Sequence, residues 1–302
     1  MGYNIGSFNL HNIGVNALLN NNTRDLAKIA TIIKDEGFDV VALQEIRSEG
    51  KAFTLEKQNL KKNILMELGS DWTFKYADTE SFDNRNECYA FLWNNKRFMI
   101  SKKNEDGTGG DSYTDLCRIK KDKLRRHPYY IRLTPLDGAF IELRLICIHT
   151  SFSNKAMLRD ELEILLKDIY PSIEDRRYGN NRPAYTILLG DYNACLWRSW
   201  NTMTDNPMFL NCDENDLIYV GSKKIITVQD QRTTLKQITD DESQRGYSHD
   251  YDHFSYDLNG FEGVKVKAKR IDAVRKYCND DFEQYYKTVS DHIPVIMNIE
   301  LK

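Results

Sequence analysis

The sequence has few of the features that mark exported or membrane-bound proteins. Its 302 residues include only six cysteines, and no two of them form a Cys-x-x-Cys pair. Cysteines scattered in this way predict free thiols in a reducing, cytoplasmic setting, and argue against a disulfide framework or a zinc site. No run of about 18 apolar residues occurs, and no basic-then-apolar segment leads the chain. We therefore expect neither a secretion signal nor a stable association with membranes.

An excess of charge of one sign is also lacking. Lys and Arg total 42 against 45 Asp and Glu, which gives a net charge of −3. This balance excludes a globally basic nucleic-acid binder but is compatible with a local basic patch. Hydrophobic residues make up 41% of the chain and aromatic residues 11%, so a substantial core is expected and general disorder is excluded.

Short apolar segments recur along the whole chain. Some have the two-residue period of strands and others have helical spacing, and several strands follow one another directly. No internal repeat and no linker composition interrupts this pattern. We therefore expect one domain over residues 1–302, with a mixed α/β sandwich rather than a purely parallel sheet. The expected strands cover residues 3–9, 38–43, 74–77, 88–93, 129–133, 140–148, 185–189, 225–228 and 295–301, and residues 103–116 are expected to form a polar, glycine-rich loop.

Polar residues stand where the expected strands end. Asn9, Glu45 and His149 each follow an apolar strand, as do Asp191 and Asn193. Ligand sites tend to lie at strand ends on one side of a sheet, so we expect these side chains to converge. Further polar residues that lie in or just before later strands are expected to join them, namely Asp252, Asp291 and His292.

Carboxylates that converge repel one another, so a cation is the natural occupant of such a site. Oxygen ligands without cysteine favour Mg²⁺ over zinc, with Mn²⁺ as a possible substitute. Magnesium keeps several waters and usually needs only one or two carboxylates besides phosphate oxygens of the substrate. The sequence therefore predicts a metal-dependent enzyme that acts on a phosphoester.

Four short motifs occur in order along the chain. They are Gln-Glu at residues 44–45, Gly-Asp-Tyr-Asn at 190–193, Tyr-Asp at 251–252 and Ser-Asp-His-Ile-Pro at 290–294. This ordered set resembles the endonuclease/exonuclease/phosphatase superfamily, and Asn9 and His149 match further positions of that family. The resemblance implies an α/β fold in which two mixed β-sheets pack face to face and are flanked by helices, giving a four-layer sandwich.

Three shorter matches are similar to the deoxyribonuclease I-like branch of that family. Gln-Glu-Ile-Arg at residues 44–47 resembles its Gln-Glu-Val-Arg, which implies that Arg47 reaches the DNA minor groove. Glu-Cys-Tyr-Ala-Phe-Leu at residues 87–92 resembles its Glu-Arg-Tyr-Leu-Phe-Leu, and implies that Glu87 orients a catalytic histidine. Arg-His-Pro at residues 126–128 resembles its Arg-Glu-Pro, and implies that Arg126 contacts DNA phosphate. The cysteine at position 88 and the histidine at position 127 depart from the branch pattern.

The chemistry and the resemblance together predict the metal site and the main catalytic pair. Glu45, helped by Asn9 and Asp291, is expected to hold Mg²⁺ through oxygen, and the metal to polarise the phosphate. His292 is expected to act as a general base, or as a hydrogen-bond partner of the scissile phosphate. Its orienting partner is expected to be Asp252, which would fix the tautomer and raise the pKa of the imidazole.

The same reasoning predicts a second set of groups around the phosphate. Asp191 and Asn193 are expected to position or activate the attacking water. His149, paired with Glu87, is expected to transfer a proton or bind phosphate. The remaining histidines are expected to be structural or surface residues, namely His11, His127, His249 and His253.

The predicted function is that of a Mg²⁺-dependent endonuclease that hydrolyses DNA phosphodiester bonds, so DNA is the expected substrate and partner. An alternative is a phosphatase or phosphodiesterase acting on inositol phosphates or phospholipid headgroups, as a sphingomyelinase does. A lipid enzyme would need an apolar membrane-docking loop, and the loop at residues 103–116 is polar. A non-catalytic binding module of the same fold would be expected to lack a carboxylate or a histidine of the set, and none is missing.

Overall fold

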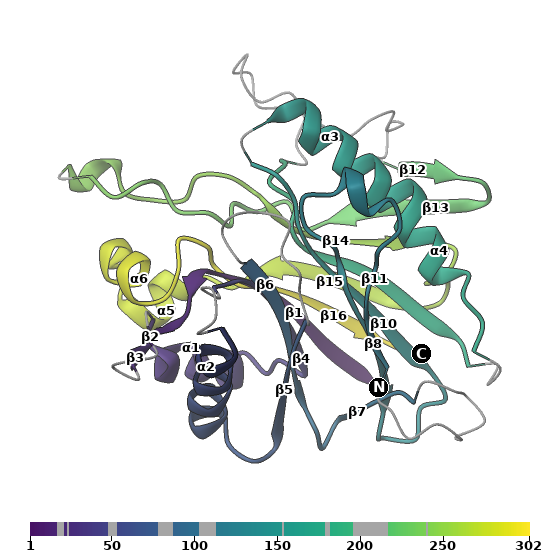
Figure 1. Ribbon diagram of the computed structural model, residues 1–302, viewed down its shortest axis with the longest axis horizontal. Helices are drawn as coiled ribbons and strands as arrows, with labels where there is room; N and C mark the ends of the chain where they lie inside the picture. The colour runs from purple at the N-terminus through teal and green to yellow at the C-terminus, as the bar shows by residue number, and fades with distance from the viewer. Residues whose placement is uncertain are drawn as a thin grey trace.

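Two β-sheets pack face to face and carry helices on their outer faces (Figure 1). The computed structural model describes residues 1–16, 21–22, 24–47, 53–77, 87–102, 113–152, 154–178, 182–195, 217–239 and 241–302. Helix, sheet, sheet and helix therefore follow one another as four layers, and the α/β sandwich expected from the sequence is confirmed.

The first sheet has the strand order β15-β16-β1-β4-β6-β5 within the described segments. The neighbours β1 and β4 run parallel, and the other neighbouring pairs run antiparallel. Its strands are β1 (Gly2–Ile13), β4 (Val40–Arg47), β5 (Trp72–Tyr76), β6 (Glu87–Asn94), β15 (Lys265–Arg270) and β16 (Val295–Glu300).

The second sheet has the order β12-β13-β14-β11-β10-β9-β7, and β8 also pairs with β9. Here β10 and β11 run parallel, while β11 and β14 run antiparallel. Its strands are β7 (Phe98–Ile100), β8 (Thr114–Leu116), β9 (Tyr129–Pro135), β10 (Glu142–His149), β11 (Ala184–Asp191), β12 (Leu217–Val220), β13 (Lys223–Val228) and β14 (Asp252–Asp257). A short ribbon of β2 (Val15–Asn16) and β3 (Asn21–Asn22) lies apart from both sheets.

The helices divide between the two outer faces (Figure 1). On the first sheet lie α1 (Leu26–Asp35), α2 (Phe53–Leu68), α5 (Ala273–Cys278) and α6 (Phe282–Thr288). On the second lie α3 (Lys155–Ile164), the π-helix η3 (Leu165–Ile169) and α4 (Tyr170–Glu174), and short 3₁₀ turns form at η2 (Lys121–Lys123) and η4 (Glu242–Gln244). Helix α1 begins where the Asp25 side chain accepts a hydrogen bond from the amide of Lys28, an N-cap that satisfies one of the first helical N–H groups.

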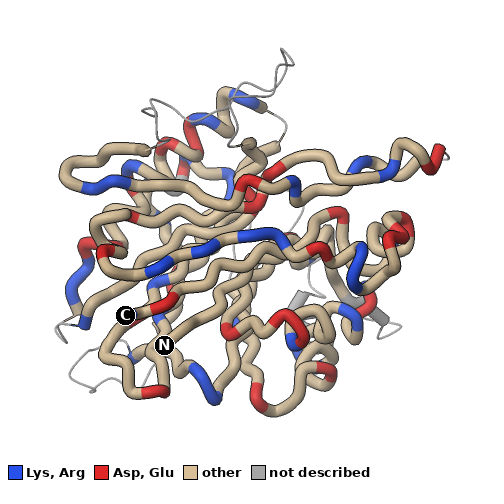
Figure 2. The backbone as a smooth tube through the Cα atoms, turned by 180° about the vertical axis from the view of Figure 1, so that it is seen from behind, with Lys and Arg blue, Asp and Glu red and all other residues tan. Residues whose placement is uncertain are grey.

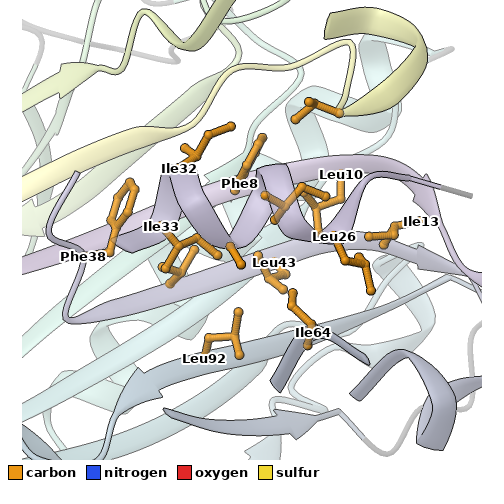
Figure 3. Close-up of a cluster of buried hydrophobic side chains, with 14 of the residues drawn as sticks. Phe8, Leu10, Ile13, Leu26, Ile32, Ile33, Phe38, Leu43, Ile64 and Leu92 are labelled. Carbon is orange, nitrogen blue, oxygen red and sulfur yellow. The ribbon is translucent and has the colours of Figure 1, made fainter. Parts of the chain in front are cut away.

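Strand alternation assigns each apolar side chain to one of two layers. In β1 the odd residues Tyr3 and Ile5 face the second sheet, whereas Phe8 and Leu10 face the helices. Figure 3 shows the helix side, where Phe8 lies beside Ile32 of α1 and Leu10 lies toward Leu26 of the same helix. Because successive side chains of a strand point to opposite faces, the row between the sheets continues as far as Asn9. The left-handed residues His11 and Asn12 then interrupt the alternation, and Ile13 packs on the helix side.

The loop expected over residues 103–116 differs in part from the structure. Thr114–Leu116 form β8, which pairs with β9. Residues 103–112 lie outside the described segments. Among the helices that the structure describes, none has the length and apolar character needed to cross a membrane.

Acidic and basic residues are mixed over the molecule (Figure 2). The edge strand β15 is the exception, because Lys265, Lys267 and Lys269 alternate along its exposed side. Lysines on an edge strand oppose pairing with the edge of another molecule, so these residues keep the first sheet from extending.

Gly190 lies at a close approach between β10 and β11. Its φ is +145°, and a Cβ there would lie 2.0 Å from the carbonyl oxygen of Ile148. Only glycine fits both the backbone conformation and the space. The polar segment that follows β11 therefore depends on a glycine at this position.

We expect Gly190→Ala to lower the free energy of unfolding by about 3 kcal/mol or more, because backbone strain adds to the collision. The matched control is Gly138→Ala, at a φ of +88° with nothing within 4 Å of the added Cβ. That change should cost about 1 kcal/mol. Urea unfolding of both variants measures the difference, and equal losses would contradict the steric explanation.

Candidate active site

The rows of residues between the two sheets change from apolar to polar at one end. In β10 the row of Leu143, Leu145 and Cys147 continues into His149, and in β11 the same row ends at Asp191. Register places His149 beside Asp191 and Asp191 beside Asp252. In β1 the odd row ends at Asn9, and in β6 the row of Tyr89 and Phe91 begins with Glu87. The expected convergence at the strand ends is therefore seen, with the side chains drawn from both sheets.

Glu45 reaches this cluster because β4 contains a bulge. Val41 and Leu43 point toward the helices, so strict alternation would send Glu45 into the same apolar layer. The register of β4 against β6 shifts between Leu43 and Ile46, and Glu45 has a φ of +57°. Ile46 takes the helix-facing position, and the Glu45 carboxylate turns to Asn9, whose Nδ2 donates to Oε1 at 3.0 Å. A strained residue of this kind in a bulge is typical of functional sites.

Asp191 is the centre of the cluster and is 1% exposed. Its Oδ1 accepts the amide N–H of Asn193 at 2.8 Å, and its Oδ2 accepts Asn9 Nδ2 at 3.0 Å. Asn193 has a φ of +47° and donates its own Nδ2 to the Thr150 carbonyl at 2.9 Å. The tight turn after β11 thus fixes Asp191 and Asn193 together.

His292 is oriented by a buried carboxylate. Its Nδ1 lies 2.8 Å from Oδ2 of Asp252, and its Nε2 lies 3.6 Å from Oδ2 of Asp191. The Ser290 hydroxyl accepts the His292 amide N–H and donates to the Asn9 carbonyl, which ties this segment to β1. Burial lowers the pKa of His292, but Asp252 and Asp191 outweigh burial and raise it well above its usual range.

His149 has an equivalent arrangement on the other side of Asp191. Its Nδ1 contacts Glu87 in a short hydrogen bond, and its Nε2 lies 3.6 Å from Oδ2 of Asp191 and 3.9 Å from Oε1 of Glu45. Glu87 in turn pairs with Arg126, whose Nη2 lies 2.7 Å from Oε2 of Glu87. Burial lowers the pKa of His149, but the charge and hydrogen bond of Glu87 together with the charge of Asp191 outweigh burial and raise it. Two histidines, each held by a carboxylate, therefore face one Asp191 oxygen.

Three of these residues could hold a metal ion. Donor atoms of Glu45, His149 and Asp191 lie within 4.8 Å of one another. Burial raises the pKa of the Asp191 carboxyl even though His292 and His149 oppose the shift, so this group lacks full compensation of its charge. A divalent cation would supply that compensation. A donor set of carboxylates and an imidazole suits Mn²⁺ better than Mg²⁺. The residues present therefore fit a divalent ion.

The other predicted metal ligands lie close by in a different arrangement. Asn9 donates its amide N–H groups to Glu45 and Asp191, while its Oδ1 accepts the amide N–H of His11 at 3.0 Å. Asp291 faces His11, with 3.2 Å between Oδ1 and Nδ1. Glu45 therefore belongs both to the predicted metal ligands and to the group of donor atoms that lie within 4.8 Å of one another.

The two predicted DNA-binding arginines lie in different environments. Arg47 is exposed at the end of β4. Arg126 is buried instead, because its guanidinium pairs with Glu87 and also donates to the carbonyls of His149 and Thr150, each at 3.3 Å. In this position Arg126 supports the His149 pair from behind.

Two residues at the site were not predicted from the sequence. His11 was expected to be structural or on the surface, yet it adjoins Asp291, and burial lowers its pKa. Arg24 donates to the His11 carbonyl at 2.7 Å. His11 has a φ of +43°, which interrupts the alternation of β1, so strand parity does not indicate its position. The sequence around Arg24 likewise carries no signal.

Loss of the Glu45 carboxylate should weaken metal binding. We expect Glu45→Gln to reduce the affinity for Mn²⁺ by about 10- to 100-fold, since one charged donor is lost. Titration calorimetry with MnCl₂ measures the change, with the exposed Glu262→Gln as control. Asp191→Asn tests the cluster of Glu45, His149 and Asp191, and Asp291→Asn tests the predicted set of Glu45, Asn9 and Asp291. Unchanged Mn²⁺ binding in Glu45→Gln would exclude both metal sites.

The Glu87 charge should make stability depend on pH in the acid range. Burial alone would raise the pKa of Glu87, but His149 and Arg126 lower it from 4.5 to about 2. The ionised Glu87 therefore contributes fully to stability at pH values above its ordinary pKa. This contribution is lost as the pH falls toward the lower pKa that Glu87 has in the folded protein. We expect wild type and Glu87→Gln to differ in unfolding free energy near neutral pH and to approach each other as pH falls. Urea unfolding across that range tests this, and parallel curves would contradict it.

Comparisons with known proteins bear on the family and the fold of the chain. A family model described as the endonuclease/exonuclease/phosphatase family matches residues 1–292. No curated protein sequence matches the chain. Among solved structures, the 2′,3′-cyclic phosphatase ANGEL2 is 13% identical with a TM-score of 0.58, over 99% of this chain and 95% of that one.

Two further structures are similar to the same extent. A mannosyl-6-phosphatase from Bacteroides thetaiotaomicron is 12% identical with a TM-score of 0.57, over 99% of this chain and 100% of that one. D. rerio TDP2, complexed with a single-strand DNA product, is 14% identical with a TM-score of 0.54, over 99% of both chains. These likenesses concern the fold. Together with the family match and the ordered motifs, they lead to one conclusion: the chain belongs to the endonuclease/exonuclease/phosphatase family of phosphoesterases.

Proposed function

We propose that the chain is a divalent-metal-dependent endonuclease that hydrolyses phosphodiester bonds of DNA. The observation that carries the proposal is the pair of carboxylate-held histidines, His149 and His292, which face one oxygen of Asp191. A phosphodiester needs one group to manage the proton of the attacking water and another to assist the leaving oxygen. Two oriented histidines meet that need from opposite sides.

The roles proposed for the residues follow from their contacts. Mg²⁺, or Mn²⁺ in its place, would be anchored at Glu45, with Asn9 and Asp291 nearby, and would polarise the phosphate and offset its charge. The raised pKa of His292 favours the imidazolium, whose Nε2–H can donate to a phosphate oxygen while Asp252 holds Nδ1.

The attacking water has its own proposed partners. Asp191 and Asn193 are fixed by one tight turn and can orient a water against phosphorus. His149, held by Glu87, is the second group able to bind phosphate or move a proton. A metal ion beside Asp191 would offset the negative charge of that carboxylate. The pKa values of both histidines would therefore fall when the metal binds.

DNA as substrate is supported by two features. Arg47 is exposed at the end of β4, two residues after Glu45, where a backbone phosphate or groove could be contacted. The TDP2 structure of similar fold was obtained with a DNA product. Smaller phosphate esters are the second candidate, because similar structures include a cyclic phosphatase and a sugar phosphatase.

A reducing, cytoplasmic location is part of the proposal. Cys117, Cys147 and Cys278 are buried thiols without a disulfide. Burial raises the pKa of the Cys117 thiol to about 12, which keeps it protonated and unreactive. Unbridged thiols of this kind are usual for proteins that remain in a reducing compartment.

Incubation of the protein with supercoiled plasmid in Mg²⁺ should produce nicked circles. EDTA should abolish the reaction, and added salt should weaken it because phosphate contacts release counterions. His292→Ala should lower the rate by about 10²- to 10⁴-fold.

The control variant Glu262→Gln should nick as wild type does, and matching melting temperatures should show that His292→Ala is folded. If wild type releases phosphate from small esters but leaves DNA intact with Mg²⁺ and Mn²⁺, the DNA proposal is wrong. Inositol phosphates and phospholipid headgroups would then be the next substrates to assay, at the same site.

A further inference from the structure

An exposed aromatic ring lies close to the candidate active site. Phe152 is 69% exposed, three residues after His149 at the end of β10. Three residues span at most about 10 Å, so the Cα atom of Phe152 lies no further than that from the Cα atom of His149. The buried Thr150 and Ser151 lead directly to it. A phenyl side chain with this exposure gains little from burial, so it contributes little to the stability of the fold.

Two further rings support Phe152 from the neighbouring strand region. The Phe152 and Tyr251 ring centroids lie 6.3 Å apart, with their planes 65° from parallel. Tyr251 stacks in turn on His249, at 4.8 Å and 9°. Tyr251 immediately precedes Asp252, the partner of His292. The three rings therefore link the ends of β10 and β14, the strands that supply His149 and Asp252.

The order of these rings leaves Phe152 as the outermost one. His249 covers one face of Tyr251, and the Ser248 hydroxyl lies 2.7 Å from His249 Nδ1, which holds that imidazole in place. Tyr251 is anchored through its backbone, since its carbonyl accepts the Tyr192 amide N–H at 2.7 Å. Phe152 meets Tyr251 at an angle instead of stacking on it, so a ring face can receive another flat group.

We propose that Phe152, backed by Tyr251, stacks on a nucleobase adjacent to the scissile phosphate, and that the preferred substrate is single-stranded or unpaired DNA. The inference rests on the proposed function and adds the form of the substrate. Base faces are covered by their neighbours inside a duplex and become available when the strand is open. Stacking on protein aromatic rings is the usual way that unpaired strands are bound.

The surroundings of Phe152 favour a base over a lipid. Asn154, the polar N-cap of α3, follows closely, and exposed Lys155 begins that helix. A surface that docks on a membrane would present several adjoining apolar side chains. Among the described residues that follow it in the chain, Phe152 is an exposed ring beside polar groups, which suits a flat base joined to a charged backbone.

The matched pair of variants is Phe152→Ala and Phe140→Ala. Phe140 is likewise exposed, at 59%, but it precedes β10 and so lies at the opposite end of that strand from His149. Binding is followed with a single-stranded oligonucleotide that carries 2-aminopurine, whose fluorescence falls on stacking, in Mg²⁺ and separately in EDTA. Cleavage is compared for single-stranded DNA, for a duplex of the same sequence and for a strand of abasic units.

Phe152→Ala should weaken oligonucleotide binding by roughly tenfold or more and lower kcat/KM for single-stranded DNA to match. Phe140→Ala should change neither, and cleavage of the abasic strand should be the same in all three proteins. Duplex cleaved by wild type as fast as the single strand, or fluorescence quenching that Phe152→Ala retains, would overturn the stacking inference alone. Quenching that depends on Phe152, in a protein that cleaves no DNA, would uphold the ring site and reject the nuclease.

Discussion

The buried carboxylate of Asp191 is the constraint on which the arrangement of the site depends. Removing a charge from water is costly unless partners replace the lost hydration. Asn9 and the Asn193 amide donate to Asp191, and two histidines lie 3.6 Å from it. Each partner comes from a different part of the fold. The charge of one side chain therefore requires both sheets to be correctly packed.

The buried groups that surround Asp191 need charged partners of their own. His149 needs Glu87 to stay oriented, and Glu87, also buried, needs Arg126. His292 similarly needs Asp252, whose backbone amide donates to the Thr233 hydroxyl. Removing an outer member would leave an inner charge unpaired, which usually costs more than the pair contributes as a whole. The catalytic geometry and the stability of the fold are thus linked through the same residues.

Much of the site follows from strand parity, which the sequence contains. The apolar rows of β10 and β11 place His149 and Asp191 on the face between the sheets, and the odd residues of β1 do the same for Asn9. A two-residue period together with a polar residue at the strand end was sufficient to identify these positions. The family motifs supplied the order in which the strands contribute.

Departures from parity could not be predicted in this way. Glu45 would face the helices in a regular strand, and it reaches the site through a bulge that a residue count does not reveal. Arg126 was expected to contact DNA phosphate, and its burial depends on the charge of Glu87 from a distant strand. The position of His11 depends on a left-handed backbone turn after Asn9. In each case a non-local contact or a strained conformation overrides the local pattern.

The pairing of β1 with β16 also bears on how the site comes into existence. Asn9 and His292 lie far apart in the sequence, and Ser290 bridges them through the Asn9 carbonyl only when those two strands are adjacent. Contacts of such long sequence separation carry a large loop-closure entropy and tend to form late in folding. A chain that has only partly folded therefore lacks the assembled centre. The pairing of the first and last strands of this sheet is therefore a precondition for an assembled centre.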